Sequence, residues 1–153
     1  MRARPGVFVD TIQHVLVLSI GPTAVEGRRV VLLGIQTTDT GIKLYETGMQ
    51  ASTNGVVMRS IHGTDTGRVF CVGSDQCVHE LVYRAQEGWF YSRCYLHNIT
   101  QPHLANLLPS FFKADKKISM VSVDNARRLL YVLRDGDQID VYALGHGLSL
   151  IHI

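Results

Sequence analysis

The sequence predicts an all-β fold, and three observations favour an incomplete β-propeller. The apolar runs, such as residues 15–20 and 30–35, have the length of single strands rather than of helices. Glycine and aspartate stand between several of these runs and supply the backbone conformations of tight turns. A unit of three strands then occurs twice, as the blades of a propeller do. From the pattern alone, a sandwich or a barrel is the alternative.

The N-terminal third predicts four strands. Residues 12–20 are rich in Val, Leu and Ile, and a Gly-Pro-Thr turn at 21–23 leads towards a return strand at 28–37. A short third strand is predicted at 41–46, where apolar and polar residues alternate. Another strand is predicted at 56–61. These strands are typical of a meandering antiparallel sheet.

Two hairpins follow, and they resemble each other. In each, two apolar runs flank a turn that contains aspartate: 68–73 with 78–83, and 128–133 with 138–144. One further strand precedes each hairpin, at 57–61 and at 118–123. The repeated unit is the observation that favours propeller blades over other β folds.

Blade length limits how much of a propeller the chain can form. Blades have on the order of 40–50 residues, and propellers have about 4–8 of them. A chain of 153 residues therefore holds about two to three blades. We expect residues 3–145 to be a fragment of a propeller domain. Residues 146–153 stay unassigned, as truncation or junction sequence.

One segment interrupts the β pattern and predicts a short helix at 102–112. Thr100 suits the N-cap and Pro102 the first turn, whereas Pro109 would kink or end the helix. Five large apolar residues recur at helical spacing: Leu104, Leu107, Leu108, Phe111 and Phe112. Lys113 follows at once. This composition suits either insertion at a membrane interface or burial against one face of a sheet.

The sequence contains no pattern that predicts catalysis or a cofactor. It lacks a glycine-rich phosphate loop and a Gly-x-Ser-x-Gly elbow. Cys71, Cys77 and Cys94 are odd in number and irregularly spaced, so we expect free thiols rather than disulfides or a metal site. A charged fraction of 18% and a net charge of +2, without basic clusters, do not indicate nucleic-acid binding.

Several short motifs, taken in order, resemble one family. They are Arg4-Pro-Gly-Val-Phe-Val-Asp10, Ile12-Gln-His14, Val30-Val-Leu-Leu-Gly34, Gly67-Arg-Val-Phe70, Gly73-Ser-Asp75, Glu80-Leu-Val-Tyr83, Glu87-Gly-Trp-Phe90, Leu108-Pro-Ser-Phe-Phe112 and Asp124-Asn-Ala-Arg-Arg-Leu-Leu-Tyr131. Together they resemble the N-terminal propeller of the inner-ring scaffold nucleoporins of the 155/170-kDa class. Two features depart from the family pattern: the connection at 21–29 is longer, and Gln76-Cys77 replaces a turn that usually contains glycine.

The resemblance implies a fold, a location and a role. The fold would be a seven-bladed propeller, of which this chain supplies the middle blades. The role would be structural, in the scaffold of the nuclear pore complex at the nuclear envelope, with other inner-ring nucleoporins as partners. No enzyme activity, cofactor, nucleic acid or small-molecule substrate is implied.

The resemblance also implies a peripheral contact with the nuclear envelope membrane through the segment that contains Leu104, Leu107, Leu108, Phe111, Phe112 and Lys113. The main alternative is a generic propeller adaptor that binds proteins without touching a membrane. A propeller hydrolase is a further alternative, but it would need carboxylates or metal ligands that converge on the propeller axis, and the sequence places none there.

Overall fold

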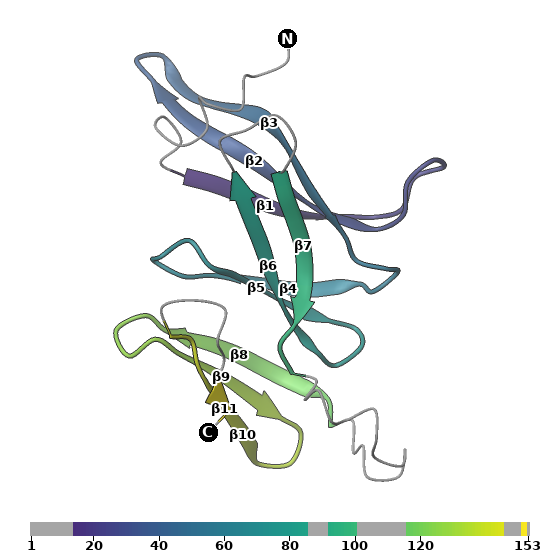
Figure 1. The fold of residues 1–153 in the computed structure, drawn as a ribbon, viewed down its shortest axis with the longest axis vertical. Coiled ribbons are helices and arrows are strands. Elements are labelled where there is room, and N and C mark those ends of the chain that lie inside the picture. Colours follow the sequence, from purple (N-terminus) through teal and green to yellow (C-terminus); the bar gives the residue numbers. More distant parts are fainter. Residues whose placement is uncertain (1–13, 86–91, 101–115, 146–150, 153) are drawn as a thin grey trace. The chain divides into compact units, whose positions relative to one another are not determined.

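The computed structural model describes residues 14–85, 92–100, 116–145 and 151–152, and every regular element in them is a β-strand (Figure 1). The strands are β1 His14–Ile20, β2 Arg29–Thr38, β3 Gly41–Ser52, β4 Met58–Gly63, β5 Val69–Gly73, β6 Val78–Ala85, β7 Ser92–Asn98, β8 Ile118–Asp124, β9 Leu129–Arg134, β10 Gln138–Ala143 and β11 Ile151–His152. They form one three-stranded and two four-stranded sheets. The predicted all-β class is confirmed. The predicted helix at 102–112 and the tail at 146–150 lie outside the described residues.

The first sheet has the order β1-β2-β3, with antiparallel neighbours. In β2, buried and partly buried residues alternate, and Val30 and Leu32 are almost completely buried. The third strand runs to Ser52 and is longer than the predicted 41–46. A bulge explains the difference, because the register with β2 shifts between Val31 and Leu33 and the strand then continues.

The second sheet has the order β4-β5-β6-β7. All five residues of β5 are buried, as expected for an inner strand whose two faces are both covered. The pairing of β4 with β5 and the hairpin predicted at 68–83 are both present. The sequence pattern did not predict β7, whose residues Ser-Arg-Cys-Tyr-Leu-His-Asn alternate too weakly to indicate a strand.

The third sheet has the order β11-β10-β9-β8. The hairpin predicted at 128–144 is β9 and β10, which pair from Gln138↔Arg134 to Ala143↔Leu129. Its turn contains Gly136 with a φ of 99°, a conformation that residues with a Cβ rarely adopt. The prediction of a hairpin from the Asp-Gly-Asp turn is therefore confirmed.

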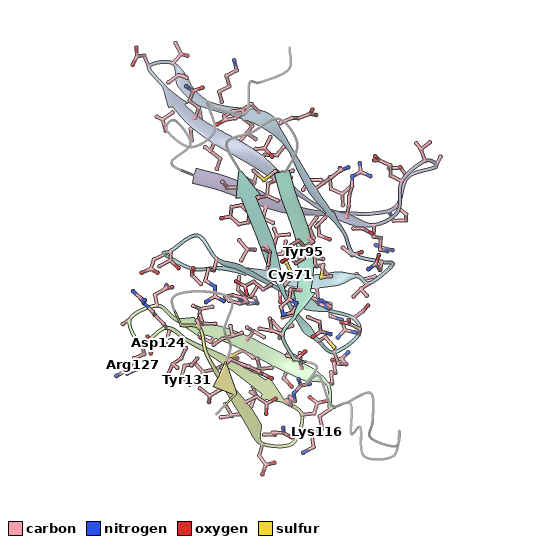
Figure 2. The ribbon with its side chains drawn as sticks, in the orientation of Figure 1. Cys71, Tyr95, Lys116, Asp124, Arg127 and Tyr131 are labelled. Atoms are coloured by element: carbon pink, nitrogen blue, oxygen red, sulfur yellow. The ribbon has the colours of Figure 1, made fainter. Side chains whose placement is uncertain are left out.

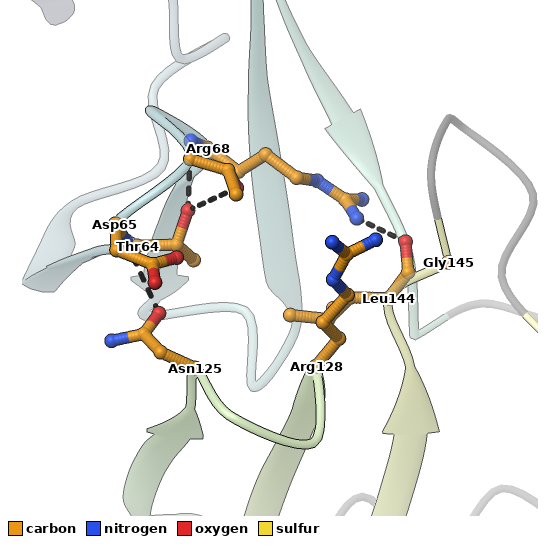
Figure 3. Close-up of a pocket in the computed structure, with 8 residues that line it drawn as sticks. Thr64, Asp65, Arg68, Asn125, Arg128, Leu144 and Gly145 are labelled. Carbon is orange, nitrogen blue, oxygen red and sulfur yellow. Dashed lines mark hydrogen bonds between the residues drawn. The ribbon is translucent and has the colours of Figure 1, made fainter.

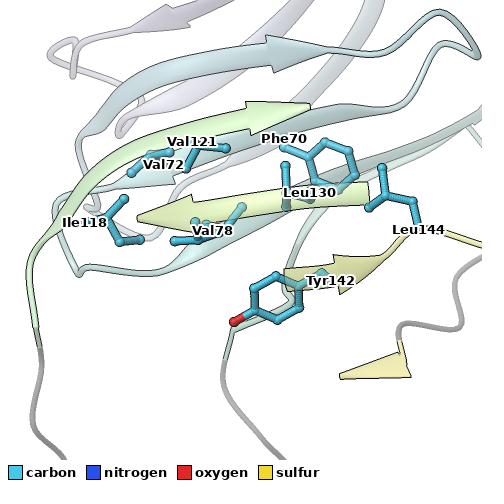
Figure 4. Packing of buried hydrophobic residues seen from close by; sticks show 9 residues of the cluster. Phe70, Val72, Val78, Ile118, Val121, Leu130, Tyr142 and Leu144 are labelled. Carbon is cyan, nitrogen blue, oxygen red and sulfur yellow. The ribbon is translucent and has the colours of Figure 1, made fainter. Parts of the chain in front are cut away.

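The chain divides into two compact units, one of Met1–Val56 with Leu81–Leu96 and one of Val57–Glu80 with His97–Ile153. The second unit contains a cluster of buried side chains, seen in Figure 4: Phe70, Val72, Val78, Ile118, Val121, Leu130, Val132, Tyr142 and Leu144. The first three of these residues come from β5 and β6, and the other six come from a part of the chain that begins 40 positions later, at Ile118. The cluster therefore joins the two hairpins of this unit into one core.

The opposite face of the third sheet is also apolar, but it is open. Met120, Leu133 and Ile139 are direct partners across β8, β9 and β10. Met120 is 61% exposed and Ile139 is 60% exposed, while Leu133 between them is partly buried. A row of three apolar side chains on an exposed sheet face is typical of a surface that another structural layer covers.

Candidate functional site: the base of segment 101–115

The predicted membrane-contact residues Leu104, Leu107, Leu108, Phe111, Phe112 and Lys113 lie outside the described residues. The structure does describe the two points where the chain enters and leaves segment 101–115. Both points lie in the second unit, and they are hydrogen-bonded to Val78 at the start of β6 and to Gln76 in the turn between β5 and β6. We call this arrangement the base of the segment.

Val78 fixes the entry point. Its backbone carbonyl accepts a hydrogen bond from the amide of Ile99 at 2.9 Å, and its own amide donates to Thr100 Oγ1 at 3.1 Å. Asn98 orients that threonine, because Asn98 Oδ1 accepts hydrogen bonds from both the amide and the hydroxyl of Thr100, each at 3.0 Å. The chain thus leaves the described sheet at a fixed position.

Gln76 fixes the exit point. Its side-chain oxygen Oε1 accepts a hydrogen bond from the amide of Ile118 at 2.9 Å, across 42 positions of sequence. Arg134 adds a second link, since its Nη1 donates to the carbonyl of Lys116 at 3.0 Å and to that of Gln76 at 3.3 Å. The amide of Asp135 also donates to the carbonyl of Lys117 at 2.9 Å.

The turn that carries these contacts is itself cross-linked. Gln76 adopts a φ of 61°, in the left-handed region that glycine occupies at little cost. Asp75 Oδ1 accepts a hydrogen bond from the amide of Cys77 at 3.2 Å, and Asp75 Oδ2 is 2.8 Å from His79 Nε2. Gln76-Cys77 stands where the family usually has a turn that contains glycine. A glycine at position 76 would fit the backbone, but it would have no side-chain oxygen to accept the hydrogen bond from the amide of Ile118.

Two cations stand beside the exit point. Lys116 and Lys117 are both exposed, and Lys116 is labelled in Figure 2. The sequence indicated Thr100 only as the N-cap of a predicted helix, and it did not indicate Gln76 or Arg134 as residues that fix the segment. No local pattern indicates the contacts of Thr100 with Val78, of Gln76 with Ile118 and of Arg134 with Lys116, because each of these three contacts joins residues 18 or more positions apart.

The cysteines carry no site in the described part of the chain. All three are free thiols, as predicted. Burial raises the pKa of Cys71 to about 11, and burial likewise raises the pKa of Cys94 to about 11, so both stay protonated near neutral pH.

Among the described residues no three His, Cys, Asp or Glu side chains are grouped to hold a metal ion. The described residues also contain no helix that is long and apolar enough to cross a membrane.

Antiparallel sheets of hairpin-linked strands, with a core between successive hairpins, define the chain as part of a β-propeller protein. The nucleoporin family described as "Nup133 N terminal like" matches residues 1–152, and the chain belongs to this family. Nucleoporins are components of the nuclear pore complex, which is therefore where the chain is located.

Individual relatives agree with the family. The chain is 32% identical over 149 residues to the nuclear pore complex protein Nup154 of Drosophila melanogaster, covering 93% of this chain and 10% of that protein. It is 36% identical over 151 residues to nucleoporin NUP170 of Chaetomium thermophilum, covering 91% of this chain and 10% of that protein. The chain thus spans about a tenth of the length of these relatives. They are named as nucleoporins and not as enzymes.

A solved structure matches the fold. It contains the Chaetomium thermophilum Nup170 NTD in complex with Nup53, and the match has a TM-score of 0.70 at 33% identity. It covers 97% of this chain and 20% of that chain. The predicted fold class and the predicted resemblance to the N-terminal domain of this class of nucleoporin are both confirmed.

Proposed function

We propose that this chain is part of a structural scaffold of the nuclear pore complex, that it binds other nucleoporins, and that segment 101–115 contacts the nuclear envelope membrane. In this role it has no catalytic activity and needs no cofactor. Membership of a nucleoporin family supports the scaffold role. The observation that carries the membrane contact is the base, where Gln76 and Val78 hold both ends of the segment.

The composition of the segment supports a membrane surface as its target. Leu104, Leu107, Leu108, Phe111 and Phe112 supply apolar side chains for the acyl boundary. Lys113 and the exposed Lys116 and Lys117 supply ammonium groups for anionic headgroups. One short apolar segment binds weakly, but many copies in one assembly bind strongly through avidity. Fixed ends lower the ordering cost of each copy, because less chain is immobilised on binding.

Other nucleoporins are the proposed protein partners. The support is the solved relative, in which the Nup170 NTD is in complex with Nup53. The identity of 33% over 97% of this chain makes a related partner the first one to test. A position in the inner ring is proposed on the same similarity.

We also propose that residues 3–145 belong to a larger propeller, with residues 146–153 unassigned. The support is the exposed apolar row of Met120, Leu133 and Ile139, which a neighbouring blade would cover. The matched structural chain is long enough to supply further blades, because this chain covers 20% of it.

Flotation with small, highly curved anionic liposomes tests the membrane contact. The protein is compared with the double variant Leu108→Asp/Phe111→Asp, which we expect to lose at least nine-tenths of the binding, since two carboxylates cannot enter the acyl boundary. The matched control is Val25→Asp/Ile42→Asp, which places the same charges on side chains that are 93% and 75% exposed, far from the segment in sequence. Circular dichroism checks that both variants are folded.

Two results would contradict the membrane proposal. Absence of binding by the unmodified protein would favour the adaptor that binds only proteins. Equal loss of binding in the control variant would show that net charge, and not the segment, determines binding. Neither result would affect the proposed binding of nucleoporins, which a pull-down with Nup53 tests separately.

A further inference from the structure

A small polar pocket in the second unit gives no preference for a charged ligand. It lies between the β4–β5 connection, the β8–β9 connection and the end of β10, and its volume is ≈ 210 Å³ (Figure 3). Among its charged lining residues, Arg68 is paired with Glu80. The other two, Asp65 and Arg128, have opposite charges. The other end of β8 and β9 differs, because two lysines stand there beside an exposed serine.

That serine is Ser119, at the start of β8. The register of β8 with β9 shifts between Ile118 and Met120, so a bulge leaves Ser119 outside the regular pairing. Its hydroxyl donates to Asp135 Oδ1 at 2.6 Å, and this hydrogen bond is exposed to solvent. In the described part of the chain β8 is also an end strand of its sheet. The hydroxyl of Ser119 is therefore accessible to another protein.

Lys116 and Lys117 stand three and two positions before Ser119, and both are exposed. Their backbone is held in place, because the carbonyl of Lys116 accepts a hydrogen bond from Arg134 Nη1 at 3.0 Å and that of Lys117 accepts one from the amide of Asp135 at 2.9 Å. The structure thus fixes the chain that precedes the serine and leaves two ammonium groups in solvent.

The sequence Lys116-Lys-Ile-Ser-Met120 has the charge pattern that one class of protein kinase selects. Kinases of this class, the basophilic kinases, bind basic side chains two and three positions before the serine with acidic groups of their own. They also accept an apolar residue directly after the serine, where Met120 is 61% exposed. Ser122 is a second exposed serine on β8, but no cation stands two or three positions before it.

We infer that Ser119 is a phosphorylation site for a basophilic protein kinase, and that the phosphate weakens the contact of segment 101–115 with an anionic membrane. Ser119 Oγ forms a bond to the γ-phosphorus of ATP as the bond from that phosphorus to the β–γ bridging oxygen breaks. ADP leaves, and the hydroxyl proton passes to a base of the kinase. The site itself is independent of the membrane, whereas its effect rests on the proposed membrane contact.

A phosphate at this position acts on both of its neighbours. It carries about 1.5 to 2 negative charges at pH 7, which offset most of the charge of Lys116 and Lys117 and leave less for anionic headgroups. The modified oxygen also has no hydrogen to donate to Asp135, so two anionic groups stand side by side. Both effects oppose a membrane contact at the exit point of the segment.

The first experiment treats the folded protein with ATP and the catalytic subunit of cyclic-AMP-dependent protein kinase, a basophilic enzyme, and locates phosphate by mass spectrometry. We expect Ser119 to be modified at no less than a tenth of the rate of a free peptide of residues 114–122. Lys116→Ala/Lys117→Ala should lower the rate at least tenfold. Ser122→Ala is the matched control and should change it less than twofold. Circular dichroism checks that the variants are folded.

The second experiment compares flotation of the phosphorylated and the unmodified protein with vesicles of phosphatidylserine and phosphatidylcholine and with vesicles of phosphatidylcholine alone. Phosphorylation should weaken binding to the anionic vesicles at least fivefold and have a smaller effect with the neutral ones, because the affected attraction is electrostatic. Ser119→Ala treated with kinase and ATP is the control, and its binding should equal that of the untreated variant.

Three results would overturn the inference. A folded protein that resists the kinase while the free peptide is modified would show that Ser119 is not accessible. An unchanged rate in Lys116→Ala/Lys117→Ala would remove the basis for this class of kinase. Undiminished binding of the phosphorylated protein to anionic vesicles would overturn the effect on the membrane contact. If the unmodified protein binds no vesicles, the proposed membrane contact and this effect fail together, while the kinase experiment still decides whether Ser119 is a site.

Discussion

Arg68 and Glu80 form a two-pronged ion pair in which Nε and Nη2 of the arginine bind the two carboxylate oxygens at 2.7 and 3.0 Å. The side chain of Glu80 is 6% exposed and that of Arg68 is 18% exposed. Arg68 also lies over the ring of Phe70, with 5.3 Å between the guanidinium carbon and the ring centre. Because this ion pair is shielded from water, removal of either partner should destabilise the fold, since the remaining charge would be buried without a partner.

The first prediction concerns this pair. Glu80→Ala should lower the free energy of unfolding by about 3–5 kcal/mol, the usual cost of leaving one buried charge without its partner. Arg68→Ala should have a similar effect, and the double variant should cost much less than the sum of the two. Chemical denaturation of the four proteins measures the coupling. Additive effects would show that the two side chains act independently.

The second prediction concerns the close approach of Gly34 in β2 to Tyr45 in β3, which are direct cross-strand partners. A Cβ on Gly34 would overlap the ring of Tyr45, with 2.6 Å to Cε2 and 2.7 Å to the hydroxyl oxygen. Gly34→Ala should therefore destabilise the protein by about 1–3 kcal/mol through overpacking. Gly34→Ala/Tyr45→Ala removes the overlap, so in thermal unfolding it should be more stable than the sum of the single effects predicts.

The third prediction tests the base. The Gln76→Gly variant should keep the backbone conformation, because glycine readily adopts a φ of 61°. It removes the side-chain oxygen that accepts a hydrogen bond from the amide of Ile118. Hydrogen exchange at Ile118 should then accelerate about fivefold, which corresponds to the loss of one hydrogen bond of about 1 kcal/mol. Asn54→Gly is the control, since Asn54 has a φ of 51° in the other unit. Unchanged exchange at Ile118 in Gln76→Gly would contradict the role given to this glutamine.

The fourth prediction follows from the raised pKa of two thiols. Burial raises the pKa of Cys71 and of Cys94 to about 11, so at pH 8 only about one molecule in a thousand carries either thiolate. Alkylation of the native protein, followed by mass spectrometry, should modify the partly exposed Cys77 first. Labelling of Cys71 or Cys94 should rise as the pH approaches 11. Modification of Cys71 as fast as Cys77 at pH 8 would contradict this.

Some elements could be predicted from local sequence and others could not. The hairpins at 68–83 and 128–144 were predictable because Asp and Gly mark their turns and β-rich runs flank them. The second half of β3 was missed because Thr47-Gly48 resembles the end of a strand. In the structure Thr47 Oγ1 donates to the carbonyl of Leu32 at 2.6 Å, beside the bulge. The strand continues past this point, where Thr47 contacts β2, and no local sequence pattern indicates that contact.

The candidate site divides in the same way. The apolar and basic character of segment 101–115 could be predicted from its residues alone. Its anchoring could not, since Gln76 and Ile118 are 42 positions apart and meet only when the two hairpins pack. The ion pair of Arg68 with Glu80 could not be predicted from the sequence either, although both residues stand in motifs that resemble the family. Contacts of this kind depend on tertiary packing, which single-sequence patterns do not report.

The base also has an evolutionary consequence. Because Thr100 is bound to Val78 and Ile118 is bound to Gln76, two positions away from Val78, the sheet does not depend on what joins the two ends. Doubling the length of a flexible connection between fixed ends costs only about 0.6 kcal/mol in closure entropy. Related proteins can therefore replace this stretch with one of different length or chemistry, for another membrane or another partner, while the sheets that hold it stay the same.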